Sequence, residues 1–370
     1  AWAPSVELMQ QPLQEKDLLE PMLQSLIWFY NCNKIYDEKS AVADMDYLNT
    51  LAASDLRILA IGKDGPEKAA RLHQFSKWMS KMLEDHTAGN AQGFKPDGSL
   101  YHHNMQYFGY GIPAITNLVH KVIEPLDGTP FEISWMAYTE MKNRFMYASY
   151  WAYPYAGFNA CGRHPITCNG QQMKTSLLKL AKSQPESAAT DPVLAQAYVE
   201  MFGGSVDELF PDLKEKPDLS MPSMIAMNHN ASLSLKHEGN TVHIKGWGDG
   251  IKKGETYKAD NRYGNYLGFG SMQIFKHTFA HKSGNEDAGW DWSSIPGTTS
   301  LLQSHDVLEG GKGFYGKKTK QKTYPSGAGV LDGKYGAFLF QLDKTSDPES
   351  LTVRKSVFAL GDTLVCLGSD

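Results

Sequence analysis

Apolar residues recur with one period in the first half of the chain and with another in the second, and this change constrains the fold more than any other feature. In residues 66–83 the apolar side chains three and four positions apart would form one buried stripe on a helix: Leu72, Phe75, Met79 and Met82. Asp64 and Pro66 precede this stripe as a cap and a first turn. The first half is therefore expected to contain amphipathic helices.

Four further segments of the first half show the same helical pattern. Asp191-Pro192 would start a helix over residues 193–202, which Gly203-Gly204 would end through a left-handed conformation. The other three segments are residues 18–30, 113–123 and 134–150. We expect a helical domain over residues 1–210.

After Pro211 apolar and polar residues alternate, which is the period of a strand with one buried face. The clearest case is a hairpin, in which residues 231–237 and 241–247 flank the turn Glu238-Gly239-Asn240. Further strands are expected at residues 266–275, 335–342, 351–359 and 363–367. The fold class is therefore α+β, with an antiparallel β domain over residues 211–370. Its last strand ends close to the C-terminus, so this sheet is expected to need strands from a longer parent chain.

Composition limits the classes of function. The 370 residues include 36 Lys and Arg against 41 Asp and Glu, a net charge of −5 at pH 7, so no overall positive field attracts nucleic acid or an anionic membrane. No apolar run approaches the roughly 20 residues that cross a bilayer, and the first residues lack the pattern of a signal peptide. Four cysteines are too few for a disulfide scaffold and lack the spacing of a zinc site. An anionic partner would have to be held by a few local cations.

Candidate chemistry is concentrated in residues 93–111, where turn residues accompany two histidines, an asparagine and three tyrosines. The candidates that we single out are His102, His103, Asn104 and Tyr110. Residues of these types either line a site carried on a loop or pack over the helices with only a polar tip in water. The loop taken alone leaves both interpretations open.

Charged candidates follow in two later segments. Arg163, beside Gly162, could reach a substrate oxygen as a permanently charged donor or could form an ordinary ion pair. In residues 254–264, Glu255 and Arg262 could contact a substrate or belong to a structural ion-pair network. The residue types do not decide between these alternatives.

Aromatic and basic candidates lie further along. Trp290 and Trp292, in residues 289–300, could stack on sugar faces or could belong to the core. A lysine run in a Gly-rich stretch could contact sulfate groups or form a solvated surface loop; its members are Lys312, Lys317, Lys318, Lys320 and Lys322.

In their order along the chain these segments resemble the chondroitin, hyaluronate and related polysaccharide lyases, and most closely the chondroitin sulfate ABC branch. The match consists of His103 followed seven residues later by Tyr110, then GRHP at 162–165, ETYKADNRYG at 255–264 and GWDWSSIPGTTS at 289–300. The resemblance implies an incomplete helical toroid followed by a β-sandwich, with the active cleft between them. It also implies a secreted or periplasmic monomer that acts on an acidic glycosaminoglycan.

The reaction implied by this resemblance is β-elimination, in which a uronic acid loses its C5 proton and the 4-linked glycosidic oxygen departs. Tyr110 would be the shared acid and base, and Arg163 would lower its pKa and donate to the bridging oxygen. His103 would hold the uronate or act as a base from another direction. Glu255 would orient Arg163 and Tyr110 through charge-assisted hydrogen bonds.

One departure separates this chain from the branches specific for chondroitin AC or hyaluronan. Those carry Glu and Asn three residues apart, whereas here the third residue after Glu255 is Lys258, which favours the ABC branch. The group that neutralises the uronate carboxylate stays open. His102 and Asn104 are candidates for it, or else serve only to structure the loop.

Other functions compete with this interpretation: a hyaluronate lyase of the same family, a non-catalytic carbohydrate-binding protein, and a glycoside hydrolase. A hydrolase would normally place paired carboxylates near the scissile bond, and the 93–111 loop contains only Asp97. No cofactor is expected. No cluster of carboxylates has metal-ligand spacing, so no metal site is predicted, and the sequence leaves open whether a divalent cation assists.

Overall fold

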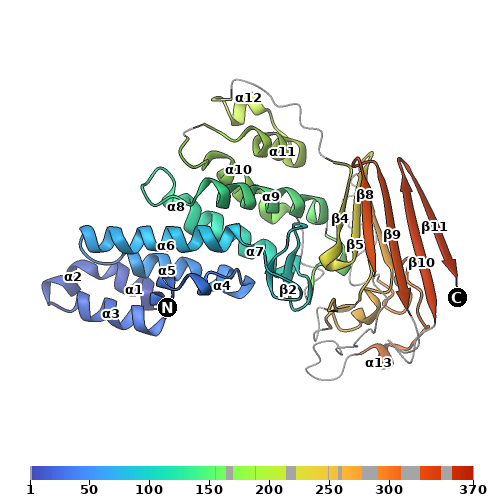
Figure 1. Ribbon diagram of the computed structural model, residues 1–370, viewed down its shortest axis with the longest axis horizontal. Helices are drawn as coiled ribbons and strands as arrows, with labels where there is room; N and C mark the ends of the chain where they lie inside the picture. The colour runs from blue at the N-terminus through green and yellow to red at the C-terminus, as the bar shows by residue number, and fades with distance from the viewer. Residues whose placement is uncertain are drawn as a thin grey trace. The chain divides into compact units, whose positions relative to one another are not determined.

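A computed structural model of the chain describes residues 2–154, 156–163, 170–187, 189–213, 222–248, 250–256, 261–276, 290–309, 326–342 and 352–369. Helices occupy the first part of the chain, and the long strands follow them (Figure 1). The α+β fold class expected from the sequence is therefore confirmed.

The chain divides into two compact units that alternate along the sequence. The helical unit comprises Ala1–Thr87, Pro113–Phe145 and Gln172–Pro217. The β unit comprises Ala88–Ile112, Met146–Gln171 and Asp218–Asp370. Because the units interleave, a division of the chain into sequence domains at residue 211 stays a prediction.

The helical unit is built from helices that pack on one another: α5 on α6, α10 on α11, and α1 on α3 and α5. The bounds of its helices are α1 Trp2–Leu8, α2 Gln10–Glu15, α3 Leu19–Phe29, α4 Met45–Thr50, α5 Ala52–Ala60, α6 Pro66–Glu84, α8 Glu124–Leu126, α10 Lys174–Lys182, α11 Pro192–Phe202 and α12 Val206–Leu209. Helices α7 (Phe108–Leu118) and α9 (Trp135–Ala152) belong partly to each unit.

Helix α6 carries the stripe that the sequence predicts. All four stripe residues are buried, and burial of a large apolar side chain contributes about 1.5–3 kcal/mol. Pro66 occupies the first turn as expected, but the expected cap is wrong: Gly65 is the N-cap residue and makes no side-chain bond. Asp64 instead forms an ion pair with Lys68 at 3.0 Å, because a carboxylate one residue too early cannot reach the first free backbone N–H groups.

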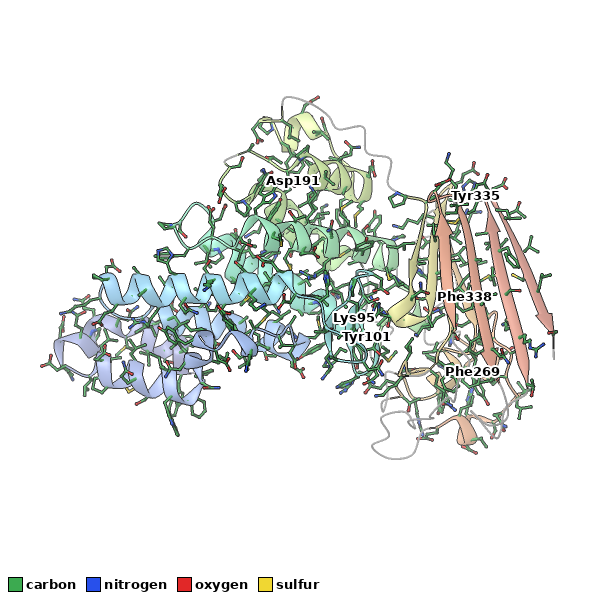
Figure 2. All side chains as sticks on the ribbon, in the orientation of Figure 1. Lys95, Tyr101, Asp191, Phe269, Tyr335 and Phe338 are labelled. Carbon is green, nitrogen blue, oxygen red and sulfur yellow. The ribbon has the colours of Figure 1, made fainter. Side chains whose placement is uncertain are left out.

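Helix α11 begins and ends as predicted. The carboxylate of Asp191, labelled in Figure 2, accepts hydrogen bonds from the backbone nitrogens of Val193 and Leu194 at 2.9 and 3.1 Å. Gly203 follows the helix at the predicted place, but with φ +76° and ψ −179° it does not adopt the left-handed helical conformation that the sequence predicts. Lys142 donates to the same carboxylate at 2.7 Å, so the cap also ties α11 to α9.

The helix predicted at residues 113–123 starts five residues earlier than expected. Helix α7 runs through Pro113 and continues as a π-helical turn over Val119–Ile123, so its first turn carries Tyr110. Helices α1, α2, α4, α5, α10 and α12 have no counterpart among the predicted segments.

In the part of the β unit that the structure describes there are two four-stranded antiparallel sheets (Figure 1), with strand orders β4-β5-β6-β7 and β11-β10-β9-β8. Their bounds are β4 Met224–Met227, β5 Ser232–His237, β6 Asn240–Lys245, β7 Ser271–Lys276, β8 Gly327–Leu331, β9 Tyr335–Leu342, β10 Val353–Leu360 and β11 Thr363–Ser369. The predicted hairpin is β5–β6, and Glu238 and Gly239 turn it with φ of 44° and 75°, as a two-residue primed turn requires.

One core lies between these two sheets. Alternate side chains of both sheets share it, including Leu233 and Ile244 from the first and Phe338 and Phe340 from the second. Figure 2 labels Phe338 and Phe269, which both belong to this core. Two antiparallel sheets that share an apolar interior form a β-sandwich.

The other face of the first sheet is polar and is also buried. It carries Ser234, His243, Lys245 and Gln273, each 0 or 1% exposed. His243 stacks on Trp151 from α9, with ring centroids 4.7 Å apart. The chain segment that leads to Arg163 packs on this polar face.

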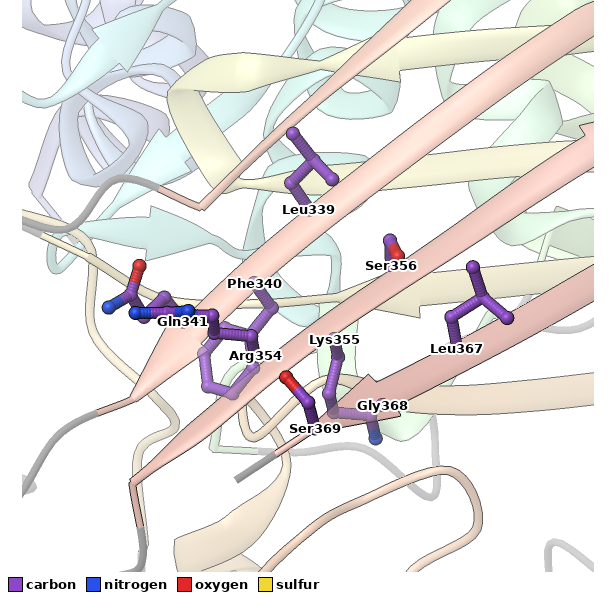
Figure 3. A pocket seen from close by; sticks show the side chains of 9 residues that line it. All are labelled: Leu339, Phe340, Gln341, Arg354, Lys355, Ser356, Leu367, Gly368 and Ser369. Carbon is purple, nitrogen blue, oxygen red and sulfur yellow. The ribbon is translucent and has the colours of Figure 1, made fainter.

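A depression of about 440 Å³ lies on strands β9, β10 and β11 of the second sheet (Figure 3). Its lining includes Leu339, Arg354, Lys355 and Leu367. None of its lining residues is a candidate from the sequence. Within the described residues, no helix is both long enough and apolar enough to cross a membrane.

Candidate functional site

A small hairpin in the β unit presents His103. Strands β1 (Gly93–Phe94), β2 (Leu100–His102) and β3 (Met105–Gln106) form a three-stranded sheet, in which His102 pairs with Met105. His103 and Asn104 are the two residues of the turn, with φ of 51° and 65°. Asparagine adopts this left-handed conformation readily, whereas for histidine it costs about 1–2 kcal/mol. The surrounding contacts must therefore hold His103 in place.

Those contacts come from the segment just before Glu255. The Asn104 carbonyl accepts a hydrogen bond from the Lys252 backbone nitrogen at 2.8 Å, and the Asn104 amide donates to the Gly250 carbonyl at 3.3 Å. Tyr101 donates to that same carbonyl at 2.8 Å. In Figure 2, Tyr101 is labelled beside Lys95, whose ammonium lies 4.6 Å from the Tyr101 ring. The turn is thus fixed to residues 250–252.

His103, Arg163 and Glu255 meet in one cluster, as the sequence predicts. His103 Nδ1 lies 3.2 Å from Glu255 Oε1, and Arg163 Nη2 donates to the same oxygen at 3.2 Å. Arg163 Nη2 and His103 Nδ1 are 3.1 Å apart. Glu255 is fully buried, whereas the side chains of Arg163 and His103 are 20% and 28% exposed. The carboxylate therefore lies at the buried end of the cluster, and the two nitrogen-bearing side chains lie toward the solvent.

Glu255 is ionised throughout the neutral range. Burial by itself would raise the pKa of this carboxyl, but hydrogen bonds from His103 and Tyr107 and the charges of His103 and Arg163 lower it to about 2. A carboxyl of this pKa cannot release a proton near pH 7. Near pH 7 it therefore accepts hydrogen bonds and carries a negative charge.

The ionised Glu255 governs the tautomer of His103. Nδ1 can donate to Glu255 or accept from Arg163, but it cannot do both at once. Donation to a carboxylate is charge-assisted and is the stronger of the two hydrogen bonds. In the neutral ring this puts the hydrogen on Nδ1 and makes Nε2 the accepting nitrogen.

Tyr107 also belongs to the cluster, although no sequence motif singles it out. Its hydroxyl accepts from Arg163 Nε at 2.7 Å and donates to Glu255. Burial, followed by the Glu255 charge, raises the pKa of this phenol well above its usual value, so it stays protonated. Nothing local distinguishes Tyr107 from the other tyrosines of the loop, because its partners lie 56 and 148 residues away in the chain.

Tyr110 lies beside the cluster in a column of rings. His102 stacks on His103 with centroids 4.0 Å apart, and on Tyr110 with centroids 5.4 Å apart. Tyr107 meets both histidines edge-on. Unlike Tyr107, which is 2% exposed, Tyr110 is only partly buried. Of these two tyrosines, Tyr110 is the one that a ligand can reach.

The polar face of the first sheet positions the segment that carries Arg163. The Asn159 backbone nitrogen donates to Gln273 at 3.3 Å, and its side-chain amide donates to Ser271 at 3.1 Å. Gly162 has φ +70°, and a Cβ there would lie 2.4 Å from the Tyr107 ring. Only glycine lets the chain pass so close to the ring, which brings Arg163 onto the Tyr107 hydroxyl.

The remaining sequence candidates have other surroundings. His102 is buried within the ring column. Asn104 hydrogen-bonds to backbone groups. Contacts of both kinds are typical of residues that structure a loop. Arg262 forms a bidentate ion pair with Glu309, both distances being 2.7 Å. Trp292 is buried in the sandwich core and Trp290 packs against it. Substrate contact by any of these residues stays a prediction.

Several sequence candidates lie outside the described residues: the lysine run at 312–322, Lys258, and the His and Pro of the GRHP motif. Their roles stay predictions as well.

Two family profiles match the chain. The profile described as "Lyase, catalytic" matches residues 1–206, and the profile described as "Polysaccharide lyase family 8, super-sandwich domain" matches residues 235–370. Among curated relatives, the chondroitin sulfate ABC endolyase of Proteus vulgaris is 28% identical over 384 residues, which cover 100% of this chain and 37% of that protein. The chondroitin sulfate ABC exolyase of Proteus vulgaris is 26% identical over 375 residues, with 96% and 37% covered.

A solved structure has a similar fold. The chondroitin AC lyase of Streptomyces coelicolor A3, in complex with chondroitin sulphate, matches with a TM-score of 0.67 and 15% identity over 98% of this chain and 52% of that chain. This likeness confirms the expected order of a helical toroid region and a β-sandwich. The chain spans about 37% of the length of the curated relatives named above.

Proposed function

Since the chain belongs to polysaccharide lyase family 8, we propose that the protein cleaves a uronic-acid-containing glycosaminoglycan by β-elimination. Chondroitin sulfate is the proposed substrate, with dermatan sulfate as a further one. The similarity to chondroitin sulfate ABC lyases supports this choice. A polymer of this kind is met outside the cytoplasm, so the proposal includes a secreted or periplasmic location.

The proposal assigns the proton transfers to Tyr110. Its phenolate takes the C5 proton of the uronate, the C5–H electrons form the C4=C5 double bond, and the C4–O bond breaks. The leaving oxygen then receives the proton from the same hydroxyl, so no water is added. The observation that carries this assignment is the contrast between the two phenols whose rings contact His102: Tyr107 is buried and kept protonated, whereas Tyr110 is partly exposed.

The cluster around Glu255 supplies charge and orientation. Glu255 holds the guanidinium of Arg163 at 3.2 Å, and this guanidinium would donate to the bridging oxygen and favour the phenolate of Tyr110. His103, with Nδ1 turned to Glu255, would bind the uronate or accept a proton through Nε2. Preorganised donors of this kind act without reorganisation during the reaction. No metal ion is required by these steps.

Two alternatives from other classes are weaker. A glycoside hydrolase needs a protonated carboxylic acid at the scissile bond, and Glu255, with a pKa of about 2, cannot supply that proton. A non-catalytic binding protein would stack sugars on Trp290 and Trp292, and Trp292 is only 5% exposed. A hyaluronate lyase of the same family differs from the proposal in its substrate alone.

The test is digestion of chondroitin sulfate, dermatan sulfate and hyaluronan by the full-length protein, followed by ultraviolet absorbance and product size over time. The expected result is an absorbing unsaturated uronide from chondroitin sulfate. Reducing ends without absorbance would identify a hydrolase, and binding without products a carbohydrate-binding protein. Cleavage of hyaluronan alone would move the assignment to that branch. Binding should also weaken as salt rises, because the polymer is a polyanion.

A further inference from the structure

One fully buried asparagine, Asn261, joins the two halves of the charged cluster. Its Nδ2 donates to the carbonyl of Glu255 at 2.6 Å and to the carbonyl of Gly162 at 3.3 Å. Gly162 immediately precedes Arg163, and the two carbonyls come from segments that are 93 residues apart in the chain. A single amide group therefore links the backbone that carries the guanidinium to the backbone that carries the carboxylate.

The orientation of this amide follows from its surroundings. Turned the other way, its oxygen would face two carbonyl oxygens, which repel it, so the nitrogen must point toward them. The oxygen of Asn261 is buried and has no hydrogen-bond partner among the described residues. The side chain of Asn261 therefore stabilises the structure through the two hydrogen bonds that its nitrogen donates.

Gly264 makes room for this arrangement. A Cβ on Gly264 would lie 1.8 Å from Asn261 Oδ1, a separation that no side chain tolerates. Any other residue at 264 would push the amide away from the carbonyls of Glu255 and Gly162. The turn over residues 261–264 is therefore shaped around the side chain of Asn261.

We propose that Asn261 is a positioning residue, which sets the separation of Arg163 and Glu255 by clamping their backbones together. This inference rests on the proposed function, in which that separation fixes where the guanidinium meets the bridging oxygen. Asn261 is buried and does not itself meet the substrate. Its effect on the reaction passes through Arg163 and Glu255.

The expected signature of Asn261→Ala is a fall in kcat of about 10–100-fold with KM changed little, because a displacement of about 1 Å in a catalytic group has effects of this size. Asn261→Asp keeps the shape but turns a carboxylate toward two carbonyl oxygens. Its kcat relative to wild type should be lowest at neutral pH and should recover as pH falls, since protonation restores one donor. A purely structural loss would not produce this pH dependence of the ratio.

Matched variants separate positioning from general damage. Gly264→Ala should lower kcat as Asn261→Ala does, whereas Gly329→Ala, where a Cβ meets nothing within 4 Å, should not. Asn117→Ala removes a comparable amide bond, 2.7 Å to Asn49 in the helical unit, and should leave kcat unchanged.

The deciding measurement is a double-mutant cycle with Glu255→Gln on the full-length protein. If Asn261 acts through Glu255, adding Asn261→Ala to Glu255→Gln should lower kcat less than twofold further. Full additivity, or an Asn261→Ala enzyme with kcat within about twofold of wild type, would overturn the inference. A wild-type protein that yields no unsaturated product would instead overturn the proposed function. The same cycle, measured as the free energy of unfolding, would then show whether Asn261 and Glu255 are coupled, and additivity there would overturn the clamp.

Discussion

Two buried carboxylates of this chain each meet a cation and a phenol. In the helical unit Asp55 lies 2.6 Å from Lys34 and accepts from Tyr47 at 2.9 Å. In the β unit Glu255 meets Arg163 and Tyr107 in the same way. Both carboxylates are fully buried. The combination of residue types therefore does not by itself distinguish a reactive site from a structural ion cluster.

The two clusters differ in what else surrounds the carboxylate. Lys34 is covered by the rings of Tyr47 and Trp78, at 4.6 and 5.9 Å, so the Asp55 cluster is closed by aromatic packing. Beside Glu255 stands His103, 28% exposed, which can take or give a proton. Under the proposed function, the reactive site is therefore marked by a partly exposed histidine and not by the ion pair.

The comparison is tested most severely by Tyr110→Phe, which keeps the ring stacked on His102 and removes the hydroxyl. We expect kcat on chondroitin sulfate to fall by about 10²–10⁴-fold, since each lost proton transfer has an effect of that order. KM should change little. Steady-state kinetics of the full-length protein measure both.

The matched control is Tyr47→Phe, which removes the phenol of the helical cluster. It should lower stability and leave kcat unchanged. If Tyr110→Phe retained near-normal elimination while His103→Ala abolished it, His103 would have to be the base and the assignment of Tyr110 would be wrong.

A substitution in the Asp55 cluster of the helical unit should lower the free energy of unfolding and leave kcat unchanged. Asp55→Asn leaves Lys34 without its counter-charge, and loss of one partner of a buried pair destabilises by about 3–5 kcal/mol. The exposure of Lys34, 17%, places the expected value at the lower end. Denaturant unfolding measures this change, and kcat of the folded variant should equal that of wild type.

The control for this variant is Asp85→Asn, which removes the exposed Lys81–Asp85 pair and should change the free energy of unfolding by less than about 1 kcal/mol. Equal effects of the two variants would show that the Asp55 cluster contributes no more than a surface pair.

Lowering the pH should reduce the difference in stability between wild type and Glu255→Gln. The pKa of Glu255 is lowered from 4.5 to about 2 in the folded protein, so its ionised form stabilises the fold above pH 4.5. That contribution, on the order of 3 kcal/mol, is lost as pH falls from about 4.5 toward 2. Glu255→Gln lacks it at every pH. The difference in free energy of unfolding between the two proteins should therefore shrink over this interval, and a constant difference would contradict the depressed pKa.

The sequence predicted those features that local patterns encode. The buried stripe of α6 follows from spacing, and the β5–β6 hairpin follows from alternation around Glu238-Gly239. The start of α7 was missed because Pro113, which usually stands near a helix start, lies inside this helix. Local signals therefore predicted the type of each element better than its ends.

The site was predictable only in part, because its contacts join distant segments. His103, Arg163 and Glu255 could be named from motifs, and the structure brings them together. Tyr107 and Asn261 could not be found in this way. Their importance depends on the approach of Gly162, which the polar face of β7 imposes through Asn159, and no pattern within either segment records that contact.

The smallest effect is expected at Arg262, whose ion pair with Glu309 contrasts with both buried clusters. Arg262 is 49% exposed and Glu309 38%, and exposed pairs contribute at most about 1 kcal/mol. Arg262→Ala should therefore shift the free energy of unfolding by less than this amount. Because Glu309 occupies two of its donors at 2.7 Å, we also expect KM at low salt to stay within about twofold of wild type, a change of less than 0.5 kcal/mol. Glu309→Gln is the informative companion, since it frees the guanidinium. If Arg262→Ala raised KM about tenfold, or about 1.4 kcal/mol, and Glu309→Gln lowered it, Arg262 would exchange Glu309 for the substrate, and the substrate contact predicted from the sequence would be established.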